Sequence, residues 1–259
     1  MSIFITEDNW PDIKVDLDAQ GLSFGALPRT TNIGDSKYSL VFAEHVSLIP
    51  ESEWKDRIRE MANAGAFIGQ RFKFSPKDNF QNGYSLCWAY SLAQACMGNR
   101  GQQGQKFVQL SADSLAEDVG FRNAGNSLDS ALEYAATHGI ASREFVPQYD
   151  IKQKNWKPGW EVDRQNYIPL EWWDLGGKDI WAETVTSLLS GHGCYVGYNW
   201  ASHAVWLDML GINDKGQIMV HTPNSHGEGN DWWLVGSRAI PSMGSFVIRS
   251  MTLSDIEGL

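Results

Sequence analysis

The sequence predicts an α+β protein whose helices come mainly first and whose strands come mainly second. Apolar residues at helical spacing, each run closed by a glycine, mark segments at 50–65, 87–97 and 126–139. Beyond residue 150, short runs rich in Val, Ile, Trp and Tyr are typical of strands. With 259 residues and 42% hydrophobic composition, the chain is long enough for one large domain or for two lobes that share a cleft.

The first 48 residues mix turn signals, among them Trp10-Pro11-Asp12, with short β-like runs, so we expect irregular structure there with one or two strands. The following segment, "PESEWKDRIREMANAG", begins with Pro50, carries acidic residues in its first turn and ends at Gly65. Trp54, Ile58 and Met61 lie at helical spacing. This segment is therefore predicted to be an amphipathic helix.

The middle of the chain is predicted to be helical. One helix is expected from Cys87 to Met97, stopped by the glycine and asparagine that follow, and another in "NSLDSALEYAATHG", ending at Gly139. Beyond Asp150, "WKPGWEVDRQNYIPLEWW" has the composition of a loop, and "DIWAETVTSLLSG" has helical spacing. Strands are expected in "CYVGYNW", "HAVWLDMLGI", "GQIMVHTP" and "GSFVIRS".

Charge and cysteine content argue against several classes of protein. A formal net charge of -10 argues against a nucleic-acid partner, because nucleic-acid binders present basic surfaces. No stretch approaches the roughly 18 apolar residues of a membrane span, and the N-terminus lacks the pattern of a signal peptide. Three cysteines, Cys87, Cys96 and Cys194, are too few for a disulfide framework. We therefore expect no membrane partner and a cytoplasmic location, or a place in a particle assembled in the cytoplasm.

The stretch "QNGYSLCWAYSLAQ" places Cys87 at the start of a predicted helix. Unpaired backbone N–H groups and the dipole at a helix N-terminus favour the reactive thiolate. Gln81 lies six residues earlier on a loop that contains a glycine, so its amide could turn toward the sulfur and stabilise an oxyanion. Cys87 is thus a candidate nucleophile, although a lone free cysteine is more often an inert core residue.

A thiolate nucleophile needs a histidine as acid and base, and the histidine needs a polar group to orient it. "ASHAVWL" places His203 at the start of an apolar strand, and "IMVHTPNSHG" places Asn224 just after another. Two adjacent antiparallel strands could bring them together, although a strand-edge histidine and a turn-forming asparagine are the plainer readings. Asp208, His221 and His226 raise the question of a metal site with His203, but their spacing fits no usual ligand pattern. We expect no metal and no cofactor.

In order along the chain, four motifs resemble those of papain-like cysteine peptidases: Gln81, Cys87-Trp88-Ala89, His203-Ala204-Val205 and Asn224-Ser225. The resemblance covers roughly residues 72–250. It implies a papain-like two-lobed fold, with a helical N-terminal lobe that carries the cysteine helix and a β-barrel-like C-terminal lobe, facing each other across a cleft. Residues 1–70 would form an N-terminal extension that packs on or covers the papain-like domain at 71–259, whose helical lobe spans about 71–150 and whose β lobe spans about 151–259.

The same resemblance implies a thiol hydrolase that cuts peptide bonds through an acyl-enzyme intermediate. Cys87 would be the nucleophile, His203 the general acid and base, Asn224 the group that orients the histidine, and Gln81 the oxyanion donor. The residues implied for substrate binding are Gly125, Asn126, Trp88 and Ser202. The expected partner is a peptide or protein substrate, and a homo-oligomer or larger assembly stays open.

Departures from the family pattern leave alternatives open. Asn126 stands where a second glycine is expected, and His226 replaces the tryptophan that covers the Asn–His pair, so that cover is changed or is supplied by Trp232 or Trp233. A papain-fold assembly component of a virion or toxin complex, with weak or no activity, fits these changes. A Cys-His amidase or a transglutaminase-type acyl transferase shares the catalytic pair. The helix at 50–65 lies where family zymogens carry an inhibitory propeptide, so autoinhibition and simple packing are both open.

Overall fold

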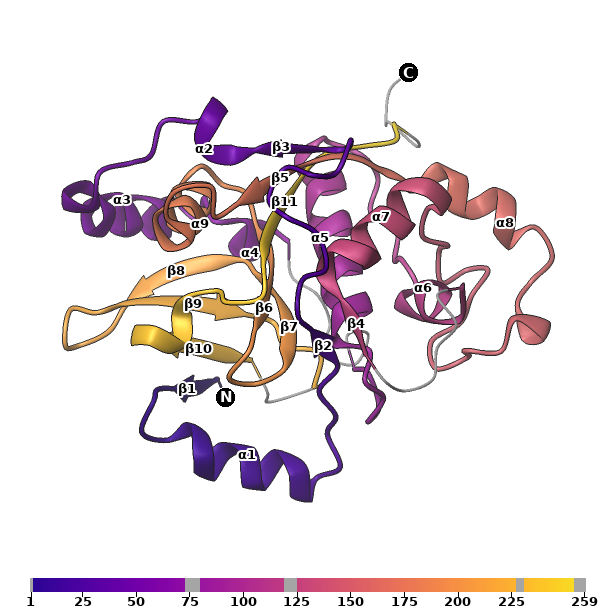
Figure 1. The fold of residues 1–259 in the computed structure, drawn as a ribbon, viewed down its shortest axis with the longest axis horizontal. Helices are drawn as coiled ribbons and strands as arrows, with labels where there is room; N and C mark the ends of the chain where they lie inside the picture. Colours follow the sequence, from indigo (N-terminus) through magenta and orange to yellow (C-terminus); the bar gives the residue numbers. More distant parts are fainter. Residues whose placement is uncertain (1, 73–79, 119–124, 227–230, 254–259) are drawn as a thin grey trace.

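The computed structural model describes residues 2–72, 80–118, 125–226 and 231–253. A helical group lies on one side of the molecule and a strand-rich group on the other, with four strands, β5, β6, β7 and β11, running between them (Figure 1). The helices are α1 (Trp10–Ala19), α2 (Phe42–His45), α3 (Glu51–Ala64), α4 (Ile68–Arg71), α5 (Cys87–Gln102), α6 (Ala112–Asp118), α7 (Leu128–His138), α8 (Trp160–Asp163) and α9 (Ile180–Leu189). The strands are β1 (Ile3–Ile5), β2 (Ala26–Leu27), β3 (Ser39–Val41), β4 (Asn126–Ser127), β5 (Pro169–Leu175), β6 (Cys194–Tyr198), β7 (His203–Leu207), β8 (Met209–Ile212), β9 (Ile218–Thr222), β10 (Trp232–Val235) and β11 (Ser245–Met251). The predicted α+β class is confirmed.

Two larger sheets and one short pairing connect the strands. The first sheet has the order β1-β10-β9-β8, and β1 is parallel to β10. The second has the order β3-β5-β11-β6-β7, and β3 is parallel to β5. Strands β2 and β4 form a separate parallel pair. The N-terminal part of the chain therefore supplies the edge strand of each larger sheet and one strand of the short pair.

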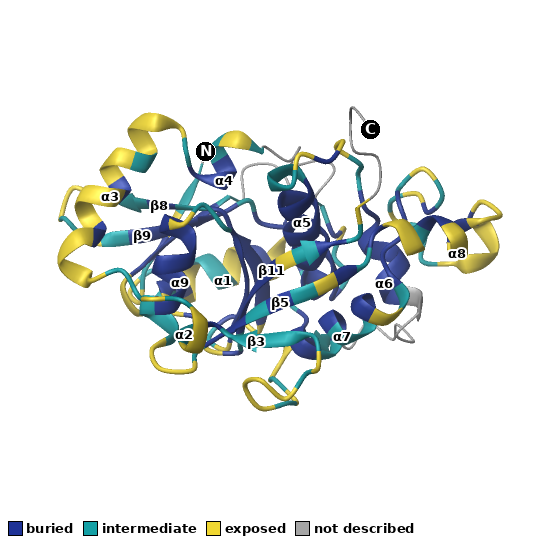
Figure 2. Cartoon of the chain, turned by 90° about the horizontal axis from the view of Figure 1, so that it is seen from above, coloured by how far each residue is buried: buried dark blue, intermediate teal, exposed yellow. Residues whose placement is uncertain are grey.

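Helix α5 forms the centre of the helical lobe, and every residue from Cys87 to Arg100 in it is buried (Figure 2). The helix runs on to Gln102, so the prediction that it stops after Met97 was wrong. Gly98 lies against β7, where an added Cβ would come within 2.8 Å of the Trp206 ring. Close packing at this glycine outweighs its weak helix propensity.

Helix α3 confirms the predicted amphipathic helix. It ends at Gly65, whose φ of 62° is in the left-handed region that glycine adopts without strain. Trp54 and Ile58 are buried, and the helix packs on β8 and α9. The exposed face of α3 points away from the sheet (Figure 2). The predicted helix that follows Asp179 is confirmed as α9.

Other predictions near the N-terminus and in the middle of the chain were wrong. The Trp-Pro-Asp triplet at Trp10, interpreted as a turn, begins helix α1, because proline is tolerated in a first turn, where its missing N–H has no helical partner. The loop-like segment at 156–173 ends in β5, which lies between β3 and β11. Strand β10 was not predicted at all.

The chain between α1 and β3 passes along the boundary of the two groups, where β2 meets β4 (Figure 1). We call residues 22–27 the strap. Within it, the N–H of Ala26 donates to the carbonyl of Ser202 at 2.9 Å, and the carbonyl of Gly25 accepts from the N–H of Asn126 at 2.9 Å. The strap is thus hydrogen-bonded on one side to Asn126, just before α7, and on the other side to Ser202, just before β7. None of the described helices is long and apolar enough to cross a membrane.

Candidate active site

Cys87 is the first residue of α5, and its side chain is fully buried. Its Sγ accepts hydrogen bonds from the backbone N–H of Gly25 at 3.3 Å and of Ala204 at 3.4 Å. Ala204 directly follows His203, so the sulfur lies beside the strand that carries the candidate base. The other donor belongs to the strap, which therefore lies directly against the candidate nucleophile.

His203 begins β7, and Asn224 lies two residues after the end of β9. These strands belong to different sheets, but the backbone N–H of Asp208 donates to the carbonyl of His221 and holds β9 beside the end of β7. Nε2 of His203 lies 2.8 Å from Oδ1 of Asn224. Because an amide oxygen only accepts, the proton sits on Nε2, which leaves Nδ1 as a basic lone pair. That Nδ1 has no hydrogen-bond partner within the described residues.

Gln81 is fully buried, and every polar atom of its amide is engaged. Nε2 donates to the carbonyl of Ser23 at 2.8 Å and also to the carbonyl of Tyr84. Oε1 accepts from the Ser225 hydroxyl at 2.5 Å, which orients the amide. One amide hydrogen of the candidate oxyanion donor is therefore already bonded to a carbonyl of the strap.

Steric fit holds the strap at the site as well. A Cβ added to Gly25 would lie 2.3 Å from the backbone oxygen of Ser85, so only glycine fits at this point of the chain. The Phe24 ring packs edge-on against His203, with centroids 5.2 Å apart, and against His226, with centroids 5.0 Å apart. Nε2 of His226 also lies 3.2 Å from the Ser23 carbonyl. The strap shields both imidazoles and the sulfur from water.

Two rings cover the candidate His–Asn pair. His226 stacks on His203 with centroids 4.7 Å apart and an interplanar angle of 28°. Trp232 lies on His203 at 5.2 Å. Trp233, the other tryptophan considered from the sequence, packs instead on His221 at 4.9 Å. Cover for the pair is thus shared between the histidine that replaces the family's tryptophan and a tryptophan of β10.

Burial dominates the electrostatics of the site. It raises the pKa of the Cys87 thiol to about 11, although the backbone N–H donors lower it. Burial also lowers the pKa of His203 well below its usual range, and the neighbouring His226 lowers it further, against the opposite effect of the Asn224 hydrogen bond. Both shifts favour the uncharged forms of the covered site, a thiol and a neutral imidazole, over a thiolate–imidazolium pair.

The residues implied for substrate binding lie in different surroundings. Gly125 and Asn126 face the strap, and a Cβ on Gly125 would lie 2.2 Å from the Gly25 carbonyl oxygen. Ser202, at a φ of 47°, accepts the strap's Ala26 N–H through its carbonyl. Trp88 is 1% exposed, and its indole N–H donates to the Ser85 carbonyl at 3.1 Å. Three of the four residues thus surround the strap, whereas Trp88 lies in the core, and their binding roles stay predictions.

Of the groups considered for a metal site, His226 lies against His203, whereas Asp208 and His221 form a separate pair. His221 Nδ1 lies 2.7 Å from Oδ1 of Asp208, and the two form a buried pair under Trp233. Within the described residues, no group of three or more His, Cys, Asp or Glu side chains could hold a metal ion.

Sequence analysis missed the strap, and with it Ser23, Phe24 and Gly25 as part of the site. It also missed Ser225 as the residue that orients Gln81. A glycine in "LSFGAL" is the one sequence signal at the strap, and a glycine alone indicates only a turn or a close approach.

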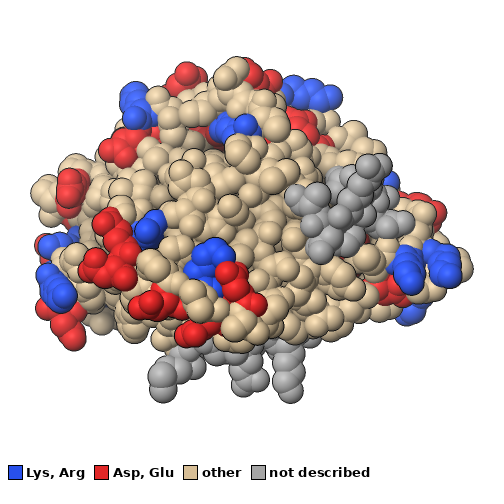
Figure 3. Space-filling model, turned by 60° about the horizontal axis from the view of Figure 1, so that its bottom comes forward, with Lys and Arg blue, Asp and Glu red and all other residues tan. Residues whose placement is uncertain are grey.

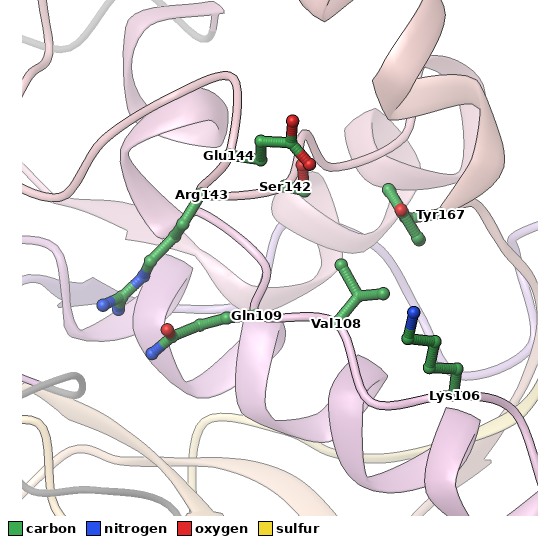
Figure 4. A pocket seen from close by; sticks show the side chains of 7 residues that line it. All are labelled: Lys106, Val108, Gln109, Ser142, Arg143, Glu144 and Tyr167. Carbon is green, nitrogen blue, oxygen red and sulfur yellow. The ribbon is translucent and has the colours of Figure 1, made fainter. Parts of the chain in front are cut away.

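A separate cavity of about 350 Å³ lies on the helical lobe (Figure 4). Lys106 and Glu144 lie at opposite sides of it, and the Arg143 side chain points away from them. Its lining residues are Lys106, Val108, Gln109, Ser142, Arg143, Glu144 and Tyr167. None of the candidate site residues lines this cavity. The face in Figure 3 carries scattered acidic and basic side chains around a broad uncharged area.

The fold is papain-like. No protein-family model matches the sequence, and no curated protein matches it either. Many solved structures do match. One is xylellain, a cysteine protease from Xylella fastidiosa, with a TM-score of 0.57 and 16% identity over 89% of this chain and 97% of that one.

Two further neighbours are proforms. Procathepsin B S9 from Trypanosoma congolense gives a TM-score of 0.58 with 13% identity, covering 97% of this chain and 99% of that one. The proform of Amb a 11, a ragweed pollen cysteine protease, gives 0.56 with 19% identity, covering 88% and 73%. These likenesses confirm the two-lobed papain-like fold expected from the sequence. At such identities they carry the fold alone.

Proposed function

We propose that this protein is a thiol peptidase in a latent form, with the strap occupying its active-site cleft. One observation carries the proposal: Cys87, the His203–Asn224 pair and Gln81 converge at a single place, under one short segment of the chain. Cys87 lies at a helix N-terminus, His203 has its basic Nδ1 unused, and Gln81 has an amide N–H that is bonded to the strap. These are the nucleophile, the base and the oxyanion donor that acyl transfer needs.

Removing the strap would change the chemistry of the site in the required direction. Burial is the main cause of the high pKa of Cys87 and of the low pKa of His203, so access of water would lower the first and raise the second. Thiolate and imidazolium would then form together and stabilise each other. The amide N–H of Gln81 that now bonds Ser23 would become available to a substrate carbonyl.

In this proposal, residues 1–70 act as a covering extension of the papain-like domain at 71–259. The covering element is the strap, whereas the helix at 50–65 that raised the question packs on β8 and α9 instead. Neighbours described as proforms or precursors are consistent with a latent state.

A second candidate is a papain-fold assembly component with no activity. This candidate is favoured by the integration of the N-terminal extension into the fold, because β1 and β3 are strands of the two larger sheets. An amidase or a transglutaminase-type acyl transferase would use the same thiol and imidazole, so only its products would distinguish it.

The test uses the 259-residue chain with Gly25→Ala, in which the strap cannot take its place on Cys87. Hydrolysis of a mixed peptide library, read by mass spectrometry, is compared with that of the Gly25→Ala/Cys87→Ala chain. We expect new peptide termini with the first chain and none with the second. If both folded chains are equally silent while Cys87 of the first reacts readily with iodoacetamide, the peptidase proposal fails and the assembly component is favoured.

A further inference from the structure

The two flanks of the strap are attached to the body in different ways. On the N-terminal side the attachment is apolar. Trp10 packs edge-on against Trp200, with centroids 4.7 Å apart, and against Trp232 at 5.9 Å. Leu17 and Leu22 are buried in the same core cluster. Releasing this side would expose several large apolar side chains, which makes it the firmer anchor.

On the C-terminal side the apolar attachment is slight: half-buried Tyr38 packs against the core, with its ring centroid 5.7 Å from that of Trp172. None of residues 27–41, all of which are described, is buried. Leu27 is 43% exposed and Ile33 is 40% exposed. Hydrophobic burial therefore holds this stretch weakly, and its polar contacts must supply most of the attachment.

The first of these contacts is made by Asp129 of α7, which is 4% exposed. Its Oδ2 accepts from the N–H and hydroxyl of Thr30, at 2.9 and 2.8 Å, and from those of Thr31, at 2.7 and 2.9 Å. Burial raises the pKa of this carboxyl, but hydrogen bonds from Thr30, Ser127 and Thr31 outweigh burial and bring it to about 2. The carboxylate is therefore ionised at neutral pH, and its hydrogen bonds are charge-assisted.

The second contact is made by Asp174 of β5, which is 1% exposed. Arg29 donates to both of its oxygens, at 2.8 and 2.6 Å, in the two-pronged geometry that suits a guanidinium. The backbone N–H of Gly34 adds a third hydrogen bond at 3.0 Å. Arg29 also donates to the carbonyl of Thr31 at 2.6 Å, which ties the loop together.

We propose that Asp129 and Asp174 form a carboxylate latch that keeps the strap on Cys87, and that the site opens when residues 27–38 leave this latch while α1 stays docked. Arg29 follows Gly25 by four residues, so a held Arg29 leaves Gly25 a tether of at most about 14 Å. When the latch is released, the next attachment along the chain after the strap is β3, so the free tether becomes much longer. That this opening activates the protein rests on the proposed function, but the accessibility of Cys87 can be measured whether or not the protein is a peptidase.

The test compares the rate at which iodoacetamide alkylates Cys87 in four versions of the 259-residue chain: the parent, Asp129→Asn, Asp174→Asn and the control Asp56→Asn. Asp56 is an exposed carboxylate of α3 that pairs with Arg59, far along the chain from the latch. We expect alkylation of Cys87 to be about tenfold faster in each latch variant and unchanged in the control. Cys96 and Cys194, both fully buried, must stay unlabelled, because their labelling would report unfolding.

Equal labelling of Cys87 in the folded latch variants and the control would overturn the latch. If a latch variant does not fold, Thr30→Val/Thr31→Val gives the same readout, because it removes two donors and leaves both carboxylates in place. Peptide hydrolysis is measured on the same samples. Faster labelling without hydrolysis supports the latch and counts against the peptidase, whereas hydrolysis without faster labelling overturns the latch and leaves the peptidase standing.

Discussion

Replacing Gly25 by alanine should drive the strap off Cys87. The added Cβ would lie 2.3 Å from the backbone oxygen of Ser85 and 2.6 Å from its carbonyl carbon, whereas ordinary contacts begin at 3.4 Å. Ser85 lies two residues before the first residue of the buried helix α5, so its backbone cannot move easily. The strap must therefore retreat by about 1 Å or more.

Such a retreat breaks the contacts that Gly25 makes. Its N–H donates to Cys87 Sγ at 3.3 Å, and its carbonyl accepts from Asn126 at 2.9 Å. A hydrogen bond contributes about 1 kcal/mol net, and overpacking adds about 1 kcal/mol or more. The total of about 2–3 kcal/mol corresponds to a rise of about 30- to 150-fold in the ratio of open to closed molecules.

The assay is alkylation of Cys87 by iodoacetamide, followed by intact mass and peptide mapping. Gly21→Ala is the matched control, because Gly21 has a φ of 70° but no atom within 4 Å of an added Cβ. It imposes backbone strain of about 1 kcal/mol without a collision in the cleft. A folded Gly25→Ala chain that is labelled at the parent's rate, or no faster than Gly21→Ala, would refute the reasoning.

Two further predictions concern His226 and Gln81. Burial lowers the pKa of His226 to about 4, so between pH 6.5 and 4 the unfolded chain binds a proton that the folded chain does not. The free energy of unfolding should therefore fall by up to about 3 kcal/mol as the pH drops through this window. His226→Phe should reduce the dependence of that free energy on pH, measured by urea unfolding at several pH values. An unchanged pH dependence would contradict the lowered pKa of His226. In the Gly25→Ala background, Gln81→Ala should lower kcat about 10²-fold with little change in KM, because an oxyanion donor acts on charge that develops in the transition state. A loss confined to KM would mean that Gln81 binds substrate instead.

Sequence patterns correctly predicted the helices whose limits are set by residues within the helix itself. Helix α3 shows its amphipathic spacing and its terminal Gly65 within its own segment, and α9 carries an N-cap, Asp179, that accepts from two backbone N–H groups. The end of α5 was not predictable in this way. Gly98 stops a helix by local propensity, and only its contact with Trp206, 108 positions later in the sequence, explains why the helix continues.

Motif order suggested the members of the candidate site, and it could not indicate that the site is covered. The motifs assigned Cys87, His203 and Asn224 to one predicted site, and the hydrogen bond from His203 to Asn224 agrees with that prediction. Nothing in the local sequence indicates that Gly25 lies on the Cys87 sulfur, because the donor is a backbone N–H that lies 62 positions away along the chain. Backbone contacts of this kind leave no signature in side-chain type, apart from the requirement for glycine.

The outer positions of β1 and β3 in the two larger sheets have a consequence for solubility. An uncovered strand presents a row of free N–H and C=O groups on which strands of other molecules can add. If the chain were trimmed before Phe42, β10 and β5 would become such uncovered strands in the same molecule. Proteolytic removal of the residues before Phe42 would thus expose the Cys87 sulfur and two unpaired strand edges together. The trimmed form should therefore self-associate, whereas a form opened at the strap alone should stay monodisperse.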